Sequence, residues 1–172
     1  MKTIVKLVVA VAFVALCGSV SAQNIKLAHI SLEDLIESMP EMDTLKVKIQ
    51  KIGKELEDEL ELLRVEYNRK LEEYVNKRDN LTDLVRTSKE QDLTQMQQRI
   101  QMFQENAQEQ YQMEYNKLLQ PILEKANKAI EAVAKEQGIT YVISANPQIL
   151  IFKAVGTVDL LPAVKQHLGI KK

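Results

Sequence analysis

Few side chains in this chain of 172 residues have types and spacings that could do chemistry. It has two histidines: His29 lies in a short β-type run, and His167 lies in a helical pattern near the C-terminus. Neither has partners at the spacing of a metal site or of a catalytic nucleophile. The tripeptide Asn80-Leu81-Thr82 fits an N-glycosylation sequon, a pattern so short that chance explains it. The sequence therefore predicts no catalytic residue, no metal site and no cofactor, and indicates that the protein is not an enzyme.

The first 22 residues have the features of an export signal. Two lysines precede eleven uninterrupted apolar residues from Leu7 to Cys17, and small residues end the segment at Ala22. This apolar run is too short for a membrane span, which needs about 20 residues. A lipoprotein attachment at Cys17 is disfavoured because Leu16 is bulky. We predict cleavage after Ala22.

The mature chain starts near Gln23 and has neither cysteine nor strong charge. Without thiols, its stability must come from packing or from assembly. The signal contains two of the 23 basic residues, which leaves 21 against 24 acidic residues and a net charge of −3. Because nucleic acid requires a concentrated basic face, the composition argues against a nucleic-acid partner.

Helical periodicity dominates the middle of the chain, where Pro121 is the only proline between Gly53 and Gly138. Two apolar stripes, at 45–85 and 93–133, each cover forty residues in eleven steps, a mean spacing of 3.64. This spacing is typical of nearly straight helices. Thr87-Ser88-Lys89-Glu90 has the form of a capping box, which predicts that the second helix begins there. We expect residues 45–133 to form an antiparallel helical hairpin with its tip near 80–88.

Folding about position 87 places Gly53 beside Pro121. Glycine loosens one helix at the height where proline removes a hydrogen bond from the other. This coincidence predicts a hinge; a tolerated kink without function is the alternative.

The two ends of the chain, residues 23–44 and 134–172, have strand patterns and predict a small β-rich base, so the fold class is α+β. The run "NIKLAHIS" precedes Ser31, a predicted helix cap with Asp34 three residues later, and this first helix should stop at Pro40. Near the other end, "ITYVIS" and "ILIF" flank an Asn-Pro turn, which predicts a β-hairpin from Tyr141 to Phe152.

The second strand of this hairpin is apolar on both faces and needs cover from two sides. We expect neighbouring subunits to provide it, so that the base is an oligomerisation platform. The predicted oligomerisation residues are Leu27, Ile30, Tyr141, Ile143, Leu150, Ile151 and Phe152.

Three segments lie at the front of the mature chain, where the arm returns to the base, and at the end: "KLAHISLEDLIESMPEM", "ANKAIEAVAKEQGITYVISAN" and "VDLLPAVKQHL". On these segments the whole mature chain resembles the Skp/OmpH family of periplasmic chaperones. The resemblance implies a periplasmic homotrimer whose helical arms enclose a cavity, and which holds unfolded outer-membrane proteins there without ATP. Family members are often strongly basic, whereas this chain is slightly acidic, so we expect membrane contact to be weak.

A cavity that holds clients needs many weak apolar contacts. Eight apolar residues off the stripes are client-contact candidates, with a wider interhelical seam as the alternative. They are Leu62, Val65, Val75, Leu84, Met102, Met113, Leu119 and Leu123.

Two polar features of the arm are best interpreted as ordinary solvent-exposed surface. Eight glutamines from Gln95 to Gln112 favour ordinary solvent-exposed helix over a cavity lining. The mixed charges near the tip favour a solvated surface.

A structural scaffold of the cell envelope that binds a folded partner is the alternative function. Exposed apolar surface inside the arms favours the chaperone, and a single patch at the tip, around Val75 to Val85, favours the scaffold.

Overall fold

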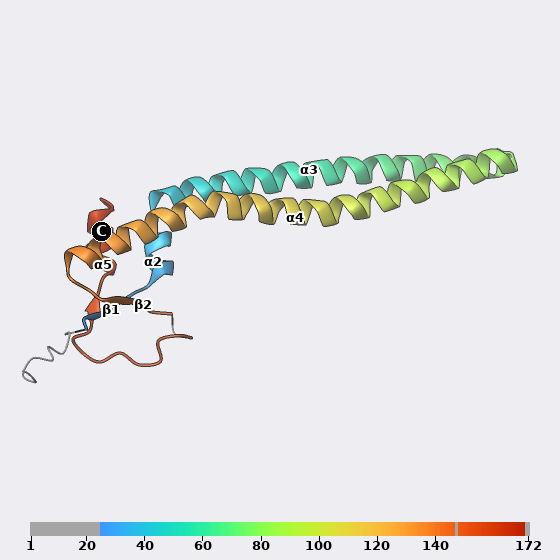
Figure 1. Cartoon of the computed structure of the whole chain (residues 1–172). Helices are drawn as coiled ribbons and strands as arrows, with labels where there is room; N and C mark the ends of the chain where they lie inside the picture. Colours follow the sequence, from blue (N-terminus) through green and yellow to red (C-terminus); the bar gives the residue numbers. More distant parts are fainter. Residues whose placement is uncertain (1–24, 147, 171–172) are drawn as a thin grey trace, which may run out of the picture.

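The computed structural model describes residues 25–146 and 148–170, so the predicted signal segment lies outside the described residues. A long helical arm projects from one side of a small base (Figure 1). This architecture confirms the predicted α+β class. In chain order the elements are β1 (Leu27–Ile30), α2 (Leu32–Glu37), α3 (Pro40–Lys77), a 3-10 turn (Arg78–Asn80), α4 (Asp83–Glu136), β2 (Tyr141–Ser144), β3 (Val158–Asp159) and α5 (Leu161–His167).

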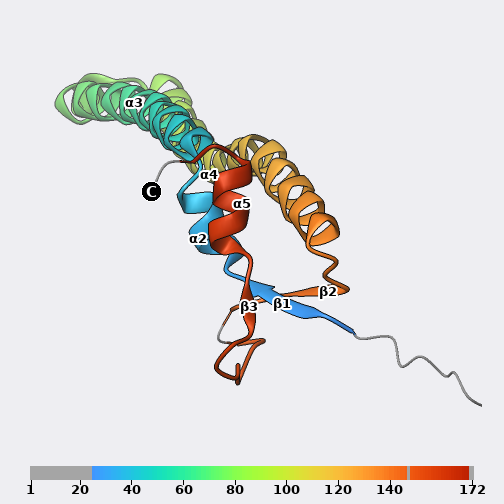
Figure 2. The same cartoon turned by 90° about the vertical axis from the view of Figure 1, so that its left-hand side faces the viewer.

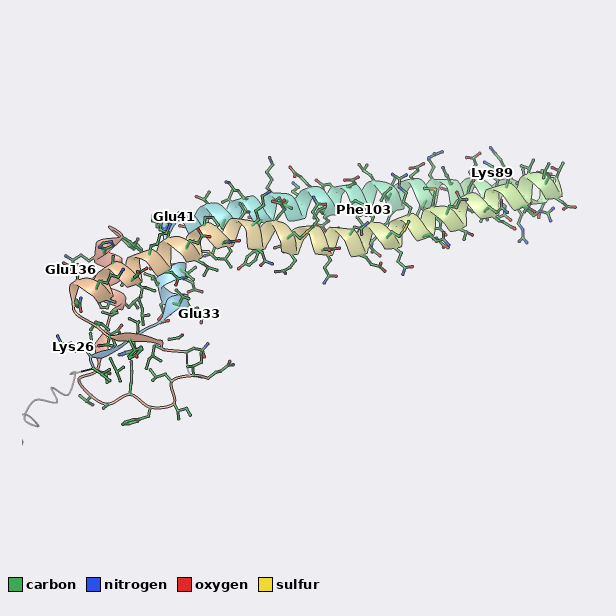
Figure 3. All side chains as sticks on the ribbon, in the orientation of Figure 1. Lys26, Glu33, Glu41, Lys89, Phe103 and Glu136 are labelled. Atoms are coloured by element: carbon green, nitrogen blue, oxygen red, sulfur yellow. The ribbon has the colours of Figure 1, made fainter. Side chains whose placement is uncertain are left out.

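The arm consists of α3 and α4, which run in opposite directions. Tyr67 accepts a hydrogen bond of 2.6 Å from Gln97 midway along the arm, and Lys125 pairs with Glu41 at its base end. Figure 3 places Glu41 near the base and Lys89 near the tip. The seam between the helices buries apolar side chains from both stripes, namely Leu45, Ile49, Leu63, Leu93 and Ile122.

The predicted start of the second arm helix is wrong. The helix begins at Asp83, because Leu81 and Thr82 have extended backbone with ψ of 144° and 155°. The predicted capping residue Thr87 lies inside the helix, where its hydroxyl donates to the Asp83 carbonyl at 2.9 Å. A capping pattern marks a helix start only where the preceding backbone is extended, and here that break comes five residues earlier.

This shift also makes the predicted pairing of Gly53 with Pro121 wrong. A turn centred near 82 instead of 87 moves the partner of Gly53 by ten residues. A Cβ atom at Gly53 would lie 3.4 Å from the ring of Tyr111, whereas Pro121 lines a hollow together with Leu45 and Lys48. Gly53 and Pro121 therefore lie at different positions along the length of the arm.

The base contains a three-stranded parallel sheet in the order β2-β1-β3. The predicted hairpin is wrong: Tyr141–Ser144 form β2, but residues 149–157 form no strand. After β2 the amides of Ile149 and Leu150 both donate to the Asn146 carbonyl, at 2.9 and 2.8 Å. These bonds close a tight turn at Asn146, and the segment after it does not pair with β2, whose partner in the sheet is β1.

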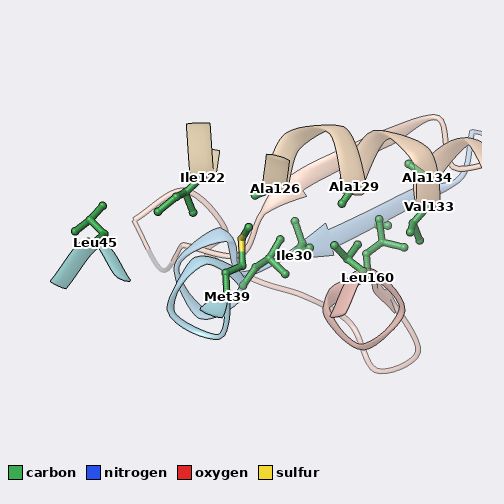
Figure 4. Close-up of a cluster of buried hydrophobic side chains, with 12 residues drawn as sticks. Ile30, Met39, Leu45, Ile122, Ala126, Ala129, Val133, Ala134 and Leu160 are labelled. Atoms are coloured by element: carbon green, nitrogen blue, oxygen red, sulfur yellow. The ribbon is translucent and has the colours of Figure 1, made fainter. Parts of the chain in front are cut away.

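The core of the base lies between the sheet and a layer of helices. Leu35, Met39, Leu160 and Val164 are fully buried and belong to one cluster with alanines of α4. Figure 4 shows Met39 and Leu160 in this cluster. Figure 2 shows α2 and α5 side by side above the strands. As predicted, Ser31 caps α2, since its hydroxyl accepts from the Asp34 amide at 3.2 Å.

Candidate functional site

The face of the sheet that points away from the helices is exposed and apolar at the edge formed by β2. Side chains alternate along a strand, so the register Leu27↔Tyr141 and His29↔Ile143 puts these four on the outer face. Leu27 and Tyr141 are 52% and 60% exposed. Ile30, predicted for the same surface, points the other way into the core and is only 3% exposed.

The segment 149–157 adds apolar side chains to this side of the base. Ile151 and Phe152 are 94% and 81% exposed, and Leu150 is half-buried. Lys153 attaches the segment to the sheet, because its ammonium lies 3.2 Å from the buried His29 Nε2. We call the resulting exposed surface the base patch; it comprises Leu27, Tyr141, Ile143, Ile149, Ile151, Phe152 and Val155.

Six of the eight client-contact candidates are exposed along the arm. Leu119 and Leu123 are half-buried, and Leu119 packs against the core of the base. The exposed six come from both helices and from several heights, so they do not form one patch at the tip. They are Leu62, Val65, Val75, Leu84, Met102 and Met113.

A hollow of about 450 Å³ lies where the arm meets the base, between α2, α4 and the end of β2. Its apolar lining includes Ile36, Met42 and Tyr115, and the carboxylates of Glu33 and Glu37 also border it. Figure 3 shows Glu33 on α2, below the arm. Sequence reasoning missed this hollow because its residues come from three distant segments.

Two polar pairs join α3 to α4 at opposite ends of the arm. The hydrogen bond from Lys125 holds the pKa of Glu41 below its ordinary value of 4.5. Near the tip, the hydrogen bond from Tyr74 to Glu90 raises the pKa of the tyrosine hydroxyl. In the described part of the chain, His, Cys, Asp and Glu side chains do not gather into a group of three that could hold a metal ion.

The family described as "Outer membrane protein (OmpH-like)" matches residues 26–168, which includes every element described above. The chain belongs to the OmpH-like family. A search of the curated proteins found no match to this OmpH-like chain.

The OmpH-like chain also has a structural neighbour. This is the crystal structure, at 2.83 Å resolution, of a candidate outer membrane chaperone (OmpH-like) from Caulobacter crescentus. The two share a TM-score of 0.69 and 15% sequence identity, and the match covers 88% of each chain. At this identity the likeness is one of fold. Among the helices that the structure describes, none is both long and apolar enough to cross a membrane.

Proposed function

We propose that this OmpH-like protein is a periplasmic chaperone that holds unfolded outer-membrane proteins without ATP. The observation that carries the proposal is the spread of exposed apolar side chains along the arm, from Leu62 at 69% exposed to Met113 at 57%. A folded partner needs one compact surface, whereas an unfolded chain needs many weak contacts over a long one.

Assembly is the second part of the proposal. The base patch carries two nearly fully exposed large apolar side chains, Ile151 and Phe152, on a base whose core is otherwise small. Surfaces of this kind commonly mark protein–protein contacts. We propose that the base patch joins subunits, that the assembly is a homotrimer as the family resemblance implies, and that the arms border a common cavity.

The proposal also covers export and arm motion. The signal segment directs the chain to the periplasm and is cleaved after Ala22, as its pattern predicts. Gly53 and Pro121 stand at different heights, so any bending of the arm is distributed over two sites. Pro121 lies within a continuous α4 and removes one backbone hydrogen bond there.

Native mass spectrometry tests holding and assembly together. A urea-unfolded β-barrel outer-membrane protein is diluted into the mature chain, and into buffer alone as the control. We expect a complex of three chains with one soluble client. If the chains assemble while the client precipitates as it does in buffer, the chaperone proposal fails and the assembly proposal stands.

One observation favours the alternative function of an envelope scaffold. Val75, Leu84 and Val85 lie close to the tip and are 62%, 83% and 41% exposed. They would serve as a contact for a folded partner. Substitution of all three by serine separates the two functions, since it should abolish scaffold binding and only weaken client holding.

A further inference from the structure

The outer face of α4, turned away from α3, differs in chemistry from the rest of the arm. Each helical residue advances by about 100°, so every third or fourth position from Leu84 to Gln120 falls on this face. Leu84 and Met102 stand eighteen residues apart, which is about five full turns, and Met113 follows about three turns later. All three are exposed, at 83%, 56% and 57%. The face is about 54 Å long at 1.5 Å per residue.

This face is almost free of charge, and we call it the amide stripe. Its eleven positions, all exposed, include a single charged residue, Glu109, although Arg99, Glu105 and Lys117 lie along its borders. Besides Glu109, the three apolar residues and Ser88, the other six members are amides. These are Gln91, Gln95, Gln98, Asn106, Asn116 and Gln120.

The corresponding outer face of α3 has the opposite character. The same helical spacing, applied from Val47 to Asn76, selects nine exposed positions. Six of them are charged, which is typical of a surface that stays in water. They are Lys51, Lys54, Asp58, Glu61, Arg69 and Glu72. The two outer faces of the arm therefore differ in charge content, although both are exposed to solvent. Solvent exposure alone does not explain this difference.

The position of the amide stripe points to its occupant. Figure 1 shows α4 on the side of the arm where the sheet and α2 lie, for most of its length. The amide stripe, which is turned away from α3, thus faces the side of the arm from which the base projects. At its base end a shallow hollow of about 490 Å³ is lined by Met113, Asn116, Gln120 and Pro121, with the charged Lys117 and Glu124 at its edge. Because proline has no N–H, the Lys117 carbonyl there lacks its usual helical donor.

We propose that the amide stripe is the surface on which an unfolded client chain lies, a proposal that rests on the proposed holding function. Side-chain amides donate and accept, so they match the unpaired N–H and C=O groups of an unfolded backbone. Methionine adapts to apolar side chains of different shape. A neutral surface loses little hydration on contact, whereas a charged one loses much. The stripe therefore accepts client segments regardless of the sign of their charge.

A matched pair of double variants tests this proposal. Gln95→Glu with Gln98→Glu adds two charges to the amide stripe, and Gln108→Glu with Gln112→Glu adds two charges to the flank of the same helix. Each is assembled from full mature chains and titrated with an unfolded β-barrel protein. We expect the stripe variant to bind about tenfold more weakly, since each buried charge leaves a desolvated group without a partner, and the flank variant to bind like the parent.

Two binding results would contradict the proposal that clients lie on the amide stripe. The first is equal client binding by the parent and the stripe variant. The second is equal weakening of client binding in both variants, which would reflect net charge alone. A lower assembly mass for the stripe variant, measured by light scattering, would instead place a second copy of the chain on α4. Failure of the parent to hold any client would defeat the proposed function itself, so the two failures are distinct.

Ionic strength supplies a second measurement on the parent protein. Exposed charges interact over about 8 Å at physiological salt and about 3 Å at 1 M salt, so charge-driven binding weakens steeply as salt rises. We expect the client Kd to change less than about twofold between about 0.05 and about 0.5 M NaCl, because the stripe has almost no charges to screen. A tenfold loss of affinity would contradict the proposal.

Discussion

Replacing Ile151 and Phe152 by aspartate should separate the subunits without unfolding them. Both side chains are almost fully exposed in the single chain, at 94% and 81%, so nearly their whole apolar area remains to be buried on assembly. Complete burial of such a side chain contributes about 1.5–3 kcal/mol. The double variant therefore loses about 3–6 kcal/mol per subunit contact, and association weakens by about two to four orders of magnitude.

The assay is light scattering on a sizing column over a range of protein concentrations, with urea unfolding of the separated chain alongside. Substitutions at exposed positions usually change folding stability by less than about 0.5 kcal/mol, so we expect monomers that remain folded. Val47→Asp with Val65→Asp is the matched control, because these residues are 68% and 53% exposed on the outer face of α3. An unchanged mass for the base variant, or an equal loss in the control, would refute the base patch as the subunit contact.

Three further predictions concern stability, each measured by urea unfolding at fixed protein concentration. Leu35→Ala should cost about 3–5 kcal/mol because the side chain is fully buried where α2 joins the core; a loss below about 1 kcal/mol would mean that the site collapses around the cavity. Gly53→Ala should stabilise by about 0.5–1 kcal/mol, because a Cβ there meets the Tyr111 ring at an ordinary contact distance of 3.4 Å; a loss of stability would show that the seam cannot admit a methyl group. The folded pKa of Glu41 is lowered by Lys125, so this pair stabilises the fold above pH 4.5 and the contribution is lost as pH falls through the folded pKa; because both side chains are partly exposed, Glu41→Gln should remove less than about 1 kcal/mol at pH 7 and nothing at low pH, and a pH-independent effect would contradict this.

The arm was predictable because its signal is local and repeated. Buried residues such as Leu45, Ile49 and Leu93 recur at helical spacing, and this spacing alone specifies two long helices. The turn between them was not predictable to the residue, because Thr87-Ser88-Lys89-Glu90 offers a capping pattern inside a helix that has already begun at Asp83. Every cross-arm pairing depends on that position, so an error of five residues displaced the partner of Gly53 by ten.

The sheet was harder because its pairings join the two ends of the chain. Nothing in residues 141–152 indicates that β1 occupies the position beside β2, which a hairpin strand would otherwise take. The apolar run around Ile151 matched a buried strand, yet it lies exposed in the single chain, since local pattern does not distinguish a core strand from an assembly surface. The sequence predicts Ile30 for that surface, although strand alternation turns its side chain into the core.

The amide stripe illustrates a different limit. The glutamines after Gln95 are visible in the sequence, and their composition alone favours ordinary solvent-exposed helix. Helical spacing fixes which of them share a face. The seam shows that this face is turned away from α3, and the base shows which side of the arm it faces. The glutamines can therefore be identified from the sequence, but only their three-dimensional placement gives them a candidate role.

The long separation between the paired strands has a consequence for the order of folding. The Lys26 amide donates to the Thr140 hydroxyl across 114 positions of sequence, and the closure of so long a loop carries a large entropic cost. Contacts near the arm tip are local and form early. As they zip toward the base, they bring the two chain ends together and shorten the loop that remains to be closed. We therefore expect the sheet to form last, so that a chain that is still folding has an arm but no completed surface with which to join another subunit.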